Sequence, residues 1–173
     1  MYKLRELQKD DIPTLNKWRN DPELIACLGA PFRFINQDVD YAWFNSYMNS
    51  RNKNVRCAIL NKNNNMIGVV SLVNIDHLNQ SCELHIMIGD TVNREKGAGS
   101  FAVKEMLKHA FMNLNLQRVE LTVLDTNKEA ISFYEKVGFT KEGTKRMAQY
   151  KNGEFVDMQL YSILRFEFIE EVS

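Results

Sequence analysis

Arg94-Glu95-Lys96-Gly97-Ala98-Gly99-Ser100 is the segment on which the interpretation of this whole sequence depends. It lies between an apolar run at 82–88, which is typical of a strand, and a helical pattern at 101–114. No Ser, Thr or Asp stands just before the helix to cap its first amides, and two cations stand where the helix macrodipole disfavours positive charge. Glycines let an anion approach the backbone closely. Bare amides and nearby cations therefore predict a phosphate or pyrophosphate site.

The helix that follows the glycines has a regular apolar face. Its apolar residues recur at intervals of three and four along one side: Val103, Met106, Leu107, Ala110, Phe111 and Leu114. This period predicts an amphipathic helix packed on a core. The simpler alternative for the preceding segment is a flexible loop with solvated charges, since short motifs often match by chance.

The composition is that of an ordinary globular domain. The 173 residues are 45% hydrophobic and 25% charged, and their formal net charge is zero. We expect one domain over residues 1–173, large enough for a sizeable core. A neutral chain has no general basic field for nucleic acid, and no apolar run is long enough to cross a membrane.

The cysteines and the N-terminus indicate where the protein works. Met1-Tyr2-Lys3-Leu4-Arg5 lacks the apolar core of a signal peptide, and the three cysteines are widely spaced. We therefore expect reduced thiols and a cytoplasmic protein. Neither the cysteines nor the three histidines have the spacing of metal ligands, so the sequence predicts no metal site.

Strand and helix patterns together indicate an α/β fold with a mixed sheet. Strand patterns occur at 2–6, 55–60, 66–75, 82–88, 118–123 and 155–164, and another strand region begins at Phe139. Helical patterns occur at 10–18, 23–28, 37–50, 101–114 and 128–137. The strand, helix and strand around the glycines imply a parallel crossover. We expect an antiparallel sheet that becomes parallel near the glycine segment, with helices on both faces.

Two familiar phosphate motifs compete for the glycine segment. A Walker A loop needs Gly-Lys-Ser/Thr after its glycines, whereas Lys96 precedes them, so this motif is excluded. Residues 97–102 do match the dinucleotide pattern G-x-G-x-x-A, but residues 89–96 separate its first glycine from the strand. Antiparallel strands also precede the segment, which is unusual for that motif. An NAD(P)-dependent oxidoreductase remains the alternative.

A third interpretation rests on resemblance to a known family. Arg94-x-x-Gly97-x-Gly99 after a strand resembles the acetyl-CoA loop of the GCN5-related N-acetyltransferase (GNAT) superfamily. Asn127-x-x-Ala130-x-x-x-Tyr134-x-x-x-Gly138-Phe139 is similar to the helix that follows in that superfamily. Trp18-Arg19-Asn20-Asp21-Pro22 and the Asn152-Gly153 hairpin resemble segments of its RimJ/RimL-like branch. The order and spacing of these motifs are specific together, although each one is modest.

The resemblance implies a sheet of about seven strands that is splayed near the coenzyme loop, and it implies acetyl-CoA as co-substrate. The backbone of Lys96, Gly97, Ala98, Gly99 and Ser100 would hold the pyrophosphate, with Arg94 in support. Met87 and Ile88 would pair with the pantetheine amides like an added strand, and Asn127 would contact the pantetheine arm or its water.

Acyl transfer to an amine needs a proton donor for the leaving thiolate and a base for the ammonium. The resemblance places Tyr134 at the thioester sulfur, and a phenol is protonated at neutral pH. The alternative is that Tyr134 belongs to an apolar helical face. Strand alternation puts Glu83 and His85 on one face, where Glu83 is the candidate base and His85 is a second. Either of them could instead be structural.

The acceptor is left open by the sequence. The RimJ/RimL-like branch includes enzymes that acetylate protein N-termini, polyamines, aminoglycosides and amino-sugar nucleotides. We expect a small-molecule amine or a peptide N-terminus, and the resemblance also implies that the chain can form a homodimer. A further alternative is a non-catalytic module that binds acyl-CoA without turnover.

Overall fold

The computed structural model describes residues 1–90 and 97–168. The strands are β1 (Lys3–Glu6), β2 (Val55–Leu60), β3 (Met66–Asp76), β4 (Ser81–Ile88), β5 (Arg118–Leu124), β6 (Thr140–Lys151) and β7 (Glu154–Leu164). The α-helices are α1 (Ile12–Arg19), α2 (Pro22–Ala26), α3 (Gln37–Met48), α4 (Ala98–Lys108) and α5 (Lys128–Val137). Short 3₁₀ turns occur at Lys9–Asp11 and Arg165–Glu167. No helix in these two ranges is long and apolar enough to cross a membrane.

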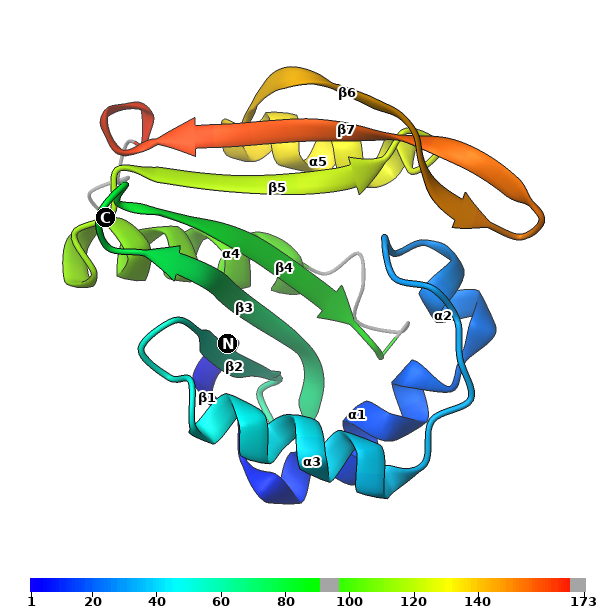
Figure 1. The fold of residues 1–173 in the computed structure, drawn as a ribbon. Coiled ribbons are helices and arrows are strands. Elements are labelled where there is room, and N and C mark those ends of the chain that lie inside the picture. Colours follow the sequence, from blue (N-terminus) through cyan, green and yellow to red (C-terminus); the bar gives the residue numbers. More distant parts are fainter. Residues whose placement is uncertain (91–96, 169–173) are drawn as a thin grey trace.

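The strands form one seven-stranded sheet in the order β1-β2-β3-β4-β5-β7-β6 (Figure 1). Neighbouring strands are antiparallel except for β4 and β5, which are parallel. The parallel pair is joined through α4, as the strand, helix and strand pattern predicted. The mostly antiparallel sheet of about seven strands is thus confirmed.

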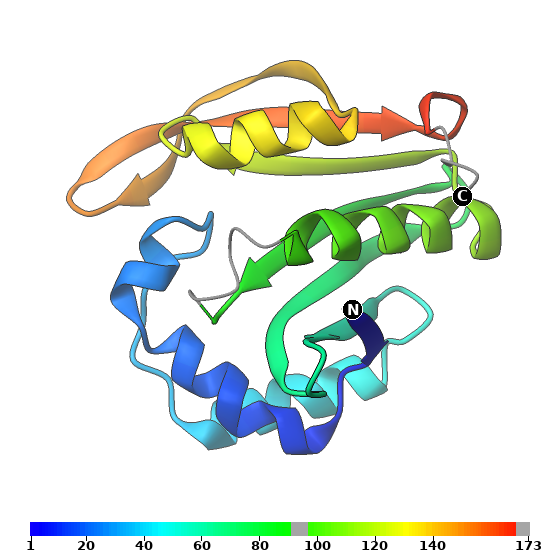
Figure 2. The same ribbon diagram turned by 180° about the vertical axis from the view of Figure 1, so that it is seen from behind.

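Helices cover both faces of the sheet because its strands alternate apolar side chains between two cores. One core lies under α4 and α5 and includes Leu84, Val103 and Leu121. Figure 2 shows these two helices lying across one face of the sheet. The other core lies under α1 and α3 and includes Leu15 and Phe44. The predicted helices on both faces are confirmed.

The parallel strands β4 and β5 separate along their length. Among the described residues, their register runs from Ser81 beside Arg118 to Glu83 beside Glu120 and then ends. Beyond this point β4 continues to pair with β3 as far as Ile88, whereas β5 pairs with β7. Figure 1 shows the two strands together at their starts and apart at their ends. We call this divergence beyond Glu83 the β4–β5 splay.

The segment 18–22 holds the N-terminal helices against the end of β4. Trp18 lies on the backbone of Gly89, where an added Cβ would come within 1.9 Å of the indole. Asn20 donates to the Ile35 carbonyl at 2.7 Å and accepts from the Ile35 amide at 3.0 Å. Asp21 accepts hydrogen bonds from the first amides of α2. The motif therefore fixes the chain between α1 and α3 beside the wide end of the splay.

Local expectations differ from the structure mainly at element ends. The helix expected at 101–114 begins at Ala98, and it changes after Lys108 into a π-helical turn at His109–Asn113. The hairpin expected at Asn152-Gly153 is present, with φ of 52° and 91°. Positive φ at both central residues is the geometry that matches the twist of the flanking strands.

Candidate active site

The start of α4 is an uncapped helix N-terminus. Gly97 is its N-cap residue in the left-handed conformation, with φ of 84°, and within residues 1–90 and 97–168 no side chain caps the first amides. The first backbone hydrogen bond of the helix is donated by the Phe101 amide to the Gly97 carbonyl, at 3.0 Å. The amides of Ala98, Gly99 and Ser100 precede that bond and point out of the helix end. The open helix terminus on which the predicted anion site depends is thus present, and anion binding there stays a prediction.

Three elements meet at this helix start. A Cβ added at Gly99 would lie 3.7 Å from Phe133 Cζ of α5 and 4.0 Å from Ile86 Cδ1 of β4. The glycine therefore brings the open end of α4 against both the splayed strand and the helix that carries Tyr134. Arg94 and Lys96, which the sequence assigns to the same site, lie outside the described residues.

Tyr134 is buried in α5 beside this junction, with 9% of its surface exposed. Its ring lies 5.1 Å from that of Phe133 and 5.7 Å from that of Phe139. Burial raises the pKa of Tyr134 to about 12. Its hydroxyl makes no hydrogen bond to any residue in the described ranges. Tyr134 is therefore both a member of the apolar face and a protonated hydroxyl without a protein partner there.

Glu83 and His85 lie together on the opposite face of β4. Glu83 Oε2 is 3.4 Å from His85 Nε2, and Glu83 Oε1 accepts a hydrogen bond from Asn74 Nδ2 at 3.0 Å. Both side chains remain solvent-accessible, with 41% of Glu83 and 60% of His85 exposed. Glu83 stands where the parallel register ends, and His85 stands two residues further along the splay. The pair that the sequence proposed as a proton relay is therefore in contact.

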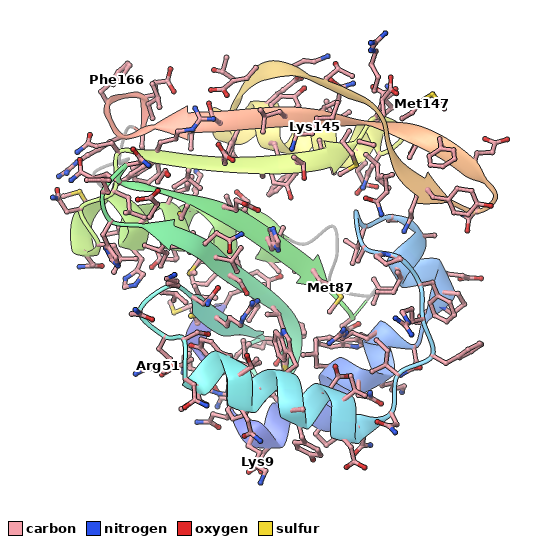
Figure 3. The ribbon with its side chains drawn as sticks, in the orientation of Figure 1. Lys9, Arg51, Met87, Lys145, Met147 and Phe166 are labelled. Atoms are coloured by element: carbon pink, nitrogen blue, oxygen red, sulfur yellow. The ribbon has the colours of Figure 1, made fainter. Side chains whose placement is uncertain are left out.

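Met87 and Ile88 form the end of β4, as expected. Met87 is partly buried against the core under α1 and α3, and it pairs with Val69 of β3. Figure 3 shows its side chain at the far end of the strand. The β5-facing edge of β4 has no strand partner from Leu84 to Met87 in the described part of the chain. Backbone groups on such an edge are available to an added extended ligand.

Asn127 has two structural partners. Its side-chain oxygen accepts from the Ala130 amide at 3.1 Å and so caps α5, while Nδ2 donates to the Cys27 carbonyl at 3.1 Å. Cys27 ends α2, so Asn127 ties the N-terminal helices to the start of the helix that carries Tyr134. Its contact with pantetheine stays a prediction.

We expect Asn127→Ala to lower the free energy of unfolding by about 1 to 2 kcal/mol, because the cap of α5 is lost. Asn127→Asp keeps the capping oxygen but loses the donor to Cys27, so we expect a smaller loss. For a chain of this length each kcal/mol corresponds to about 2 to 4 °C in thermal denaturation. An unchanged melting temperature in the alanine variant would show that the cap does not stabilise α5.

A family model settles the class of protein. The acetyltransferase (GNAT) domain model matches residues 2–140, a range that includes the splay, the start of α4 and Tyr134. The chain belongs to the GNAT acetyltransferase family. As the sequence predicted, it is an acetyl-CoA-dependent N-acetyltransferase. This membership decides against the nicotinamide-dependent oxidoreductase.

Similar proteins span nearly the whole GNAT chain. An uncharacterized N-acetyltransferase, p20 of Bacillus licheniformis, is 27% identical over 167 residues, which cover 95% of this chain and 93% of that protein. The spermidine N(1)-acetyltransferase of Vibrio cholerae is 25% identical over 167 residues, covering 96% and 94%. The crystal structure of spermidine N-acetyltransferase from Vibrio cholerae in complex with CoA and spermine has a TM-score of 0.91 at 24% identity, covering 98% of both chains. This structural likeness confirms the fold.

The structure of this GNAT enzyme also shows groups that the sequence did not single out. Trp43 of α3 lies over the guanidinium of Arg56 from β2, 4.7 Å from ring centroid to Cζ. A hollow of about 430 Å³ lies elsewhere, lined by residues that include Leu4, Val55 and Met106. None of the proposed catalytic or coenzyme-binding residues lines that hollow.

Proposed function

We propose that this GNAT enzyme transfers the acetyl group of acetyl-CoA to a primary amine of a small molecule by direct attack on the thioester. One observation carries the proposal: the β4–β5 register ends at Glu83 beside Glu120, and the candidate groups surround the splay beyond it. The open end of α4 and Tyr134 are on one side, and Glu83 with His85 are on the other face of β4.

The coenzyme would be held mainly by backbone groups. Amides at the α4 N-terminus suit a pyrophosphate because the helix dipole and the bare N–H groups both attract anions. The proposed set is Lys96, Gly97, Ala98, Gly99 and Ser100, with Arg94 in support. Met87 and Ile88 would pair with pantetheine along the β5-facing edge of β4, and Asn127 would contact the pantetheine arm.

The chemistry follows from the charges that form and disappear during transfer. Glu83, directly or through His85 or water, removes a proton from the acceptor ammonium and frees its lone pair. The new C–N bond forms as the C–S bond breaks, while a backbone amide at the end of β4 stabilises the carbonyl oxygen. Tyr134 donates its proton to the departing thiolate. The raised pKa of Tyr134 keeps that proton in place across the physiological range.

Direct attack is favoured over a cysteine-bound acyl intermediate. Burial raises the pKa of the Cys57 thiol to about 11 and that of the Cys82 thiol to about 12. Thiols with such values stay protonated and are poor nucleophiles. Cys27 is exposed on α2, where its Sγ lies 3.9 Å from the Glu23 carbonyl.

The acceptor class rests on similarity and on the charges near the splay. The Vibrio cholerae enzyme that is similar both in sequence and in structure is a spermidine acetyltransferase, which supports a small primary amine. Two carboxylates near the closed end, Glu120 and Glu142, are already neutralised by Arg118 at 2.7 and 2.5 Å. Arg118 and Ser162 together lower the pKa of Glu142 to about 2. The neutralised acids favour an amino-sugar nucleotide or a related amine, which needs few free acids, while the similarity to a spermidine acetyltransferase keeps a polyamine within the proposed class.

An amine panel tests this proposal. The full chain is mixed with acetyl-CoA and single amines, and release of the free thiol is measured. The panel contains spermidine, amino sugars and their phosphates, amino acids, and peptides with a free N-terminus. We expect amine-dependent release with at least one small molecule. Release with none of them would refute the proposal, and release with peptides alone would assign a protein N-terminus instead.

The remaining features belong to the same proposal. We infer a single domain over 1–173, a cytoplasmic location, a homodimer and a place in the RimJ/RimL-like branch. The unpaired thiols of Cys27, Cys57 and Cys82 support a reducing compartment. Sedimentation of the pure protein at several concentrations gives its mass in solution and so tests whether it forms a homodimer.

A further inference from the structure

Arg56 is a cation held between the sheet and an aromatic ring. It projects from β2 onto the face that α1 and α3 cover, beneath the ring of Trp43 at 4.7 Å. Its Nη1 donates to Ser71 Oγ of the neighbouring strand at 3.4 Å. The side chain therefore reaches from β2 to β3, on the side of β2 where β4 also lies.

Arg56 has no carboxylate partner among the described residues. Its Nε is sealed from solvent without a hydrogen bond, and its one side-chain bond goes to neutral Ser71. Burial is the main cause that lowers the pKa of the guanidinium; Tyr47 opposes this shift, and the charge of Arg19 makes a smaller contribution that also lowers the pKa. The guanidinium remains protonated in proteins, so this position carries an uncompensated positive charge.

The acids nearby are committed to other partners. Asp40 is fully buried and bonds Arg19 and Asn16. Glu6 bonds Arg51 at 2.6 Å and accepts from the Tyr47 hydroxyl at 2.7 Å. Arg19 and Arg56 thus both lie against the ring of Trp43, but of these two arginines only Arg19 forms an ion pair with Asp40. Arg56 is half-buried, and a charge withdrawn this far from water without an acidic partner is costly unless a group outside the chain balances it.

The position of Arg56 connects it with the proposed reaction site. Arg56 is in register with Ser71, and Ser71 is in register with His85. The three residues therefore stand in one row across neighbouring strands, on the same face of the sheet as Glu83. Two strand spacings separate the backbones of Arg56 and His85 by about 10 Å. If the amine of an acceptor lies at the splay, the rest of the acceptor could span this distance of about 10 Å and reach Arg56.

We propose that Arg56 binds an anionic group, a carboxylate or a phosphate, on the acceptor amine, so that the enzyme selects amines that carry negative charge at their other end. This inference rests on the proposed function and narrows its acceptor class. The planar guanidinium suits bidentate contact with either group, and stacking on Trp43 fixes its orientation. A polyamine would instead place a second cation beside Arg56.

The first experiment measures anion binding without catalysis. The full chain is saturated with coenzyme A, so that the coenzyme loop is occupied, and thermal denaturation is followed as inorganic phosphate is added. We expect phosphate to raise the melting temperature of the wild type and to leave that of Arg56→Met unchanged. Arg165→Gln is the matched control, because Arg165 lies in the 3₁₀ turn after β7, where its Nη1 donates to Asn115 at 2.9 Å, away from the Arg56 cluster. It should respond to phosphate as the wild type does.

The stability of Arg56→Met without ligand separates a binding role from a structural one. Replacing the half-buried charge of Arg56 by an apolar side chain of similar length should leave the melting temperature unchanged or raise it. If Arg56 instead serves the fold through its stacking, the methionine variant should melt lower. Arg56→Lys, which keeps the charge, serves as the second variant and should retain part of the phosphate response.

The second experiment compares matched acceptors in the thiol-release assay. Glucosamine 6-phosphate is compared with glucosamine, and 6-aminohexanoate with 1-aminohexane, so that the two pairs distinguish phosphate from carboxylate. We expect at least a tenfold higher kcat/KM for the anionic member of one pair, and a ratio near one in Arg56→Met. A wild-type preference for the neutral members or for spermidine would overturn the inference, as would an anion preference that survives in Arg56→Met. Turnover of no amine at all would refute the proposed function, while the phosphate response would still test Arg56.

Discussion

Tyr134→Phe is expected to lower turnover at least a hundredfold while leaving the affinity for coenzyme A unchanged. The substitution removes the proposed proton donor for the leaving thiolate, and general acids of this kind contribute about 10²- to 10⁴-fold. The ring itself stays packed against Phe133 and Phe139. Because the hydroxyl has no hydrogen-bond partner in the described residues, its loss leaves no protein group unsatisfied.

Steady-state rates with the best amine of the panel measure the turnover of Tyr134→Phe. Calorimetric titration with coenzyme A measures its affinity for the coenzyme. Tyr161→Phe is the matched control, since Tyr161 is also buried under α5 but donates to Glu135 at 2.9 Å. We expect that control to lose about 1 kcal/mol of stability and to keep its turnover. Wild-type turnover in Tyr134→Phe would remove Tyr134 from the mechanism.

The raised pKa of Tyr134 adds a check in alkali. An ordinary tyrosine has a pKa near 10 when unfolded, and burial raises that of Tyr134 to about 12 in the folded chain. The unfolded state therefore releases this proton first, so its contribution to stability is complete below pH 10 and is lost as the pH rises toward 12. Between pH 10 and pH 12 the free energy of unfolding of Tyr134→Phe should therefore fall less than that of the wild type. Denaturant unfolding at several pH values measures this difference.

Gly97→Leu is expected to weaken coenzyme A binding at least tenfold. Gly97 has φ of 84° and opens α4, and a Cβ added there would meet no described atom within 4 Å. The new side chain would therefore project into the open space before the helix amides, where the pyrophosphate is proposed to lie. Binding of coenzyme A by calorimetry measures the effect.

Gly153→Leu is the matched control for backbone strain. Gly153 also has positive φ, of 91°, with open space around it, but it lies in the β6–β7 hairpin turn. Both variants force a side chain into the left-handed region, which costs about 1 to 2 kcal/mol. Only Gly97→Leu should change the affinity. Equal coenzyme binding in both variants would count against the pyrophosphate site at α4.

The parts of the site that follow from local chemistry could be predicted from the sequence. The absence of a cap before the glycines, together with the apolar period after them, predicted an open helix N-terminus, which Gly97 and α4 provide. Strand alternation placed Glu83 and His85 on one face, where they are 3.4 Å apart. These features depend on residues close in the chain, so spacing alone is informative.

Partners distant in the sequence could not be predicted in this way. Asn127 was assigned to the coenzyme by resemblance, yet its side chain caps α5 and holds Cys27, 100 residues away. Arg56 gave no signal at all, because a charged residue in a strand pattern is most simply read as a solvated side chain. Its isolation from carboxylates depends on how α3 packs over β2, which no local pattern encodes.

The sequence by itself determined the elements, their alternation of faces, the uncapped helix start and the family to which the chain is similar. These follow from backbone propensity, side-chain period and motif order, all of which are local properties. The tertiary structure alone decided where β4 and β5 separate, and which hydroxyl and which cation have no charged or hydrogen-bonding counterpart of the expected kind among the described residues. Those properties arise only when segments from distant parts of the chain exclude water together, because burial and the loss of a charge partner are set by packing.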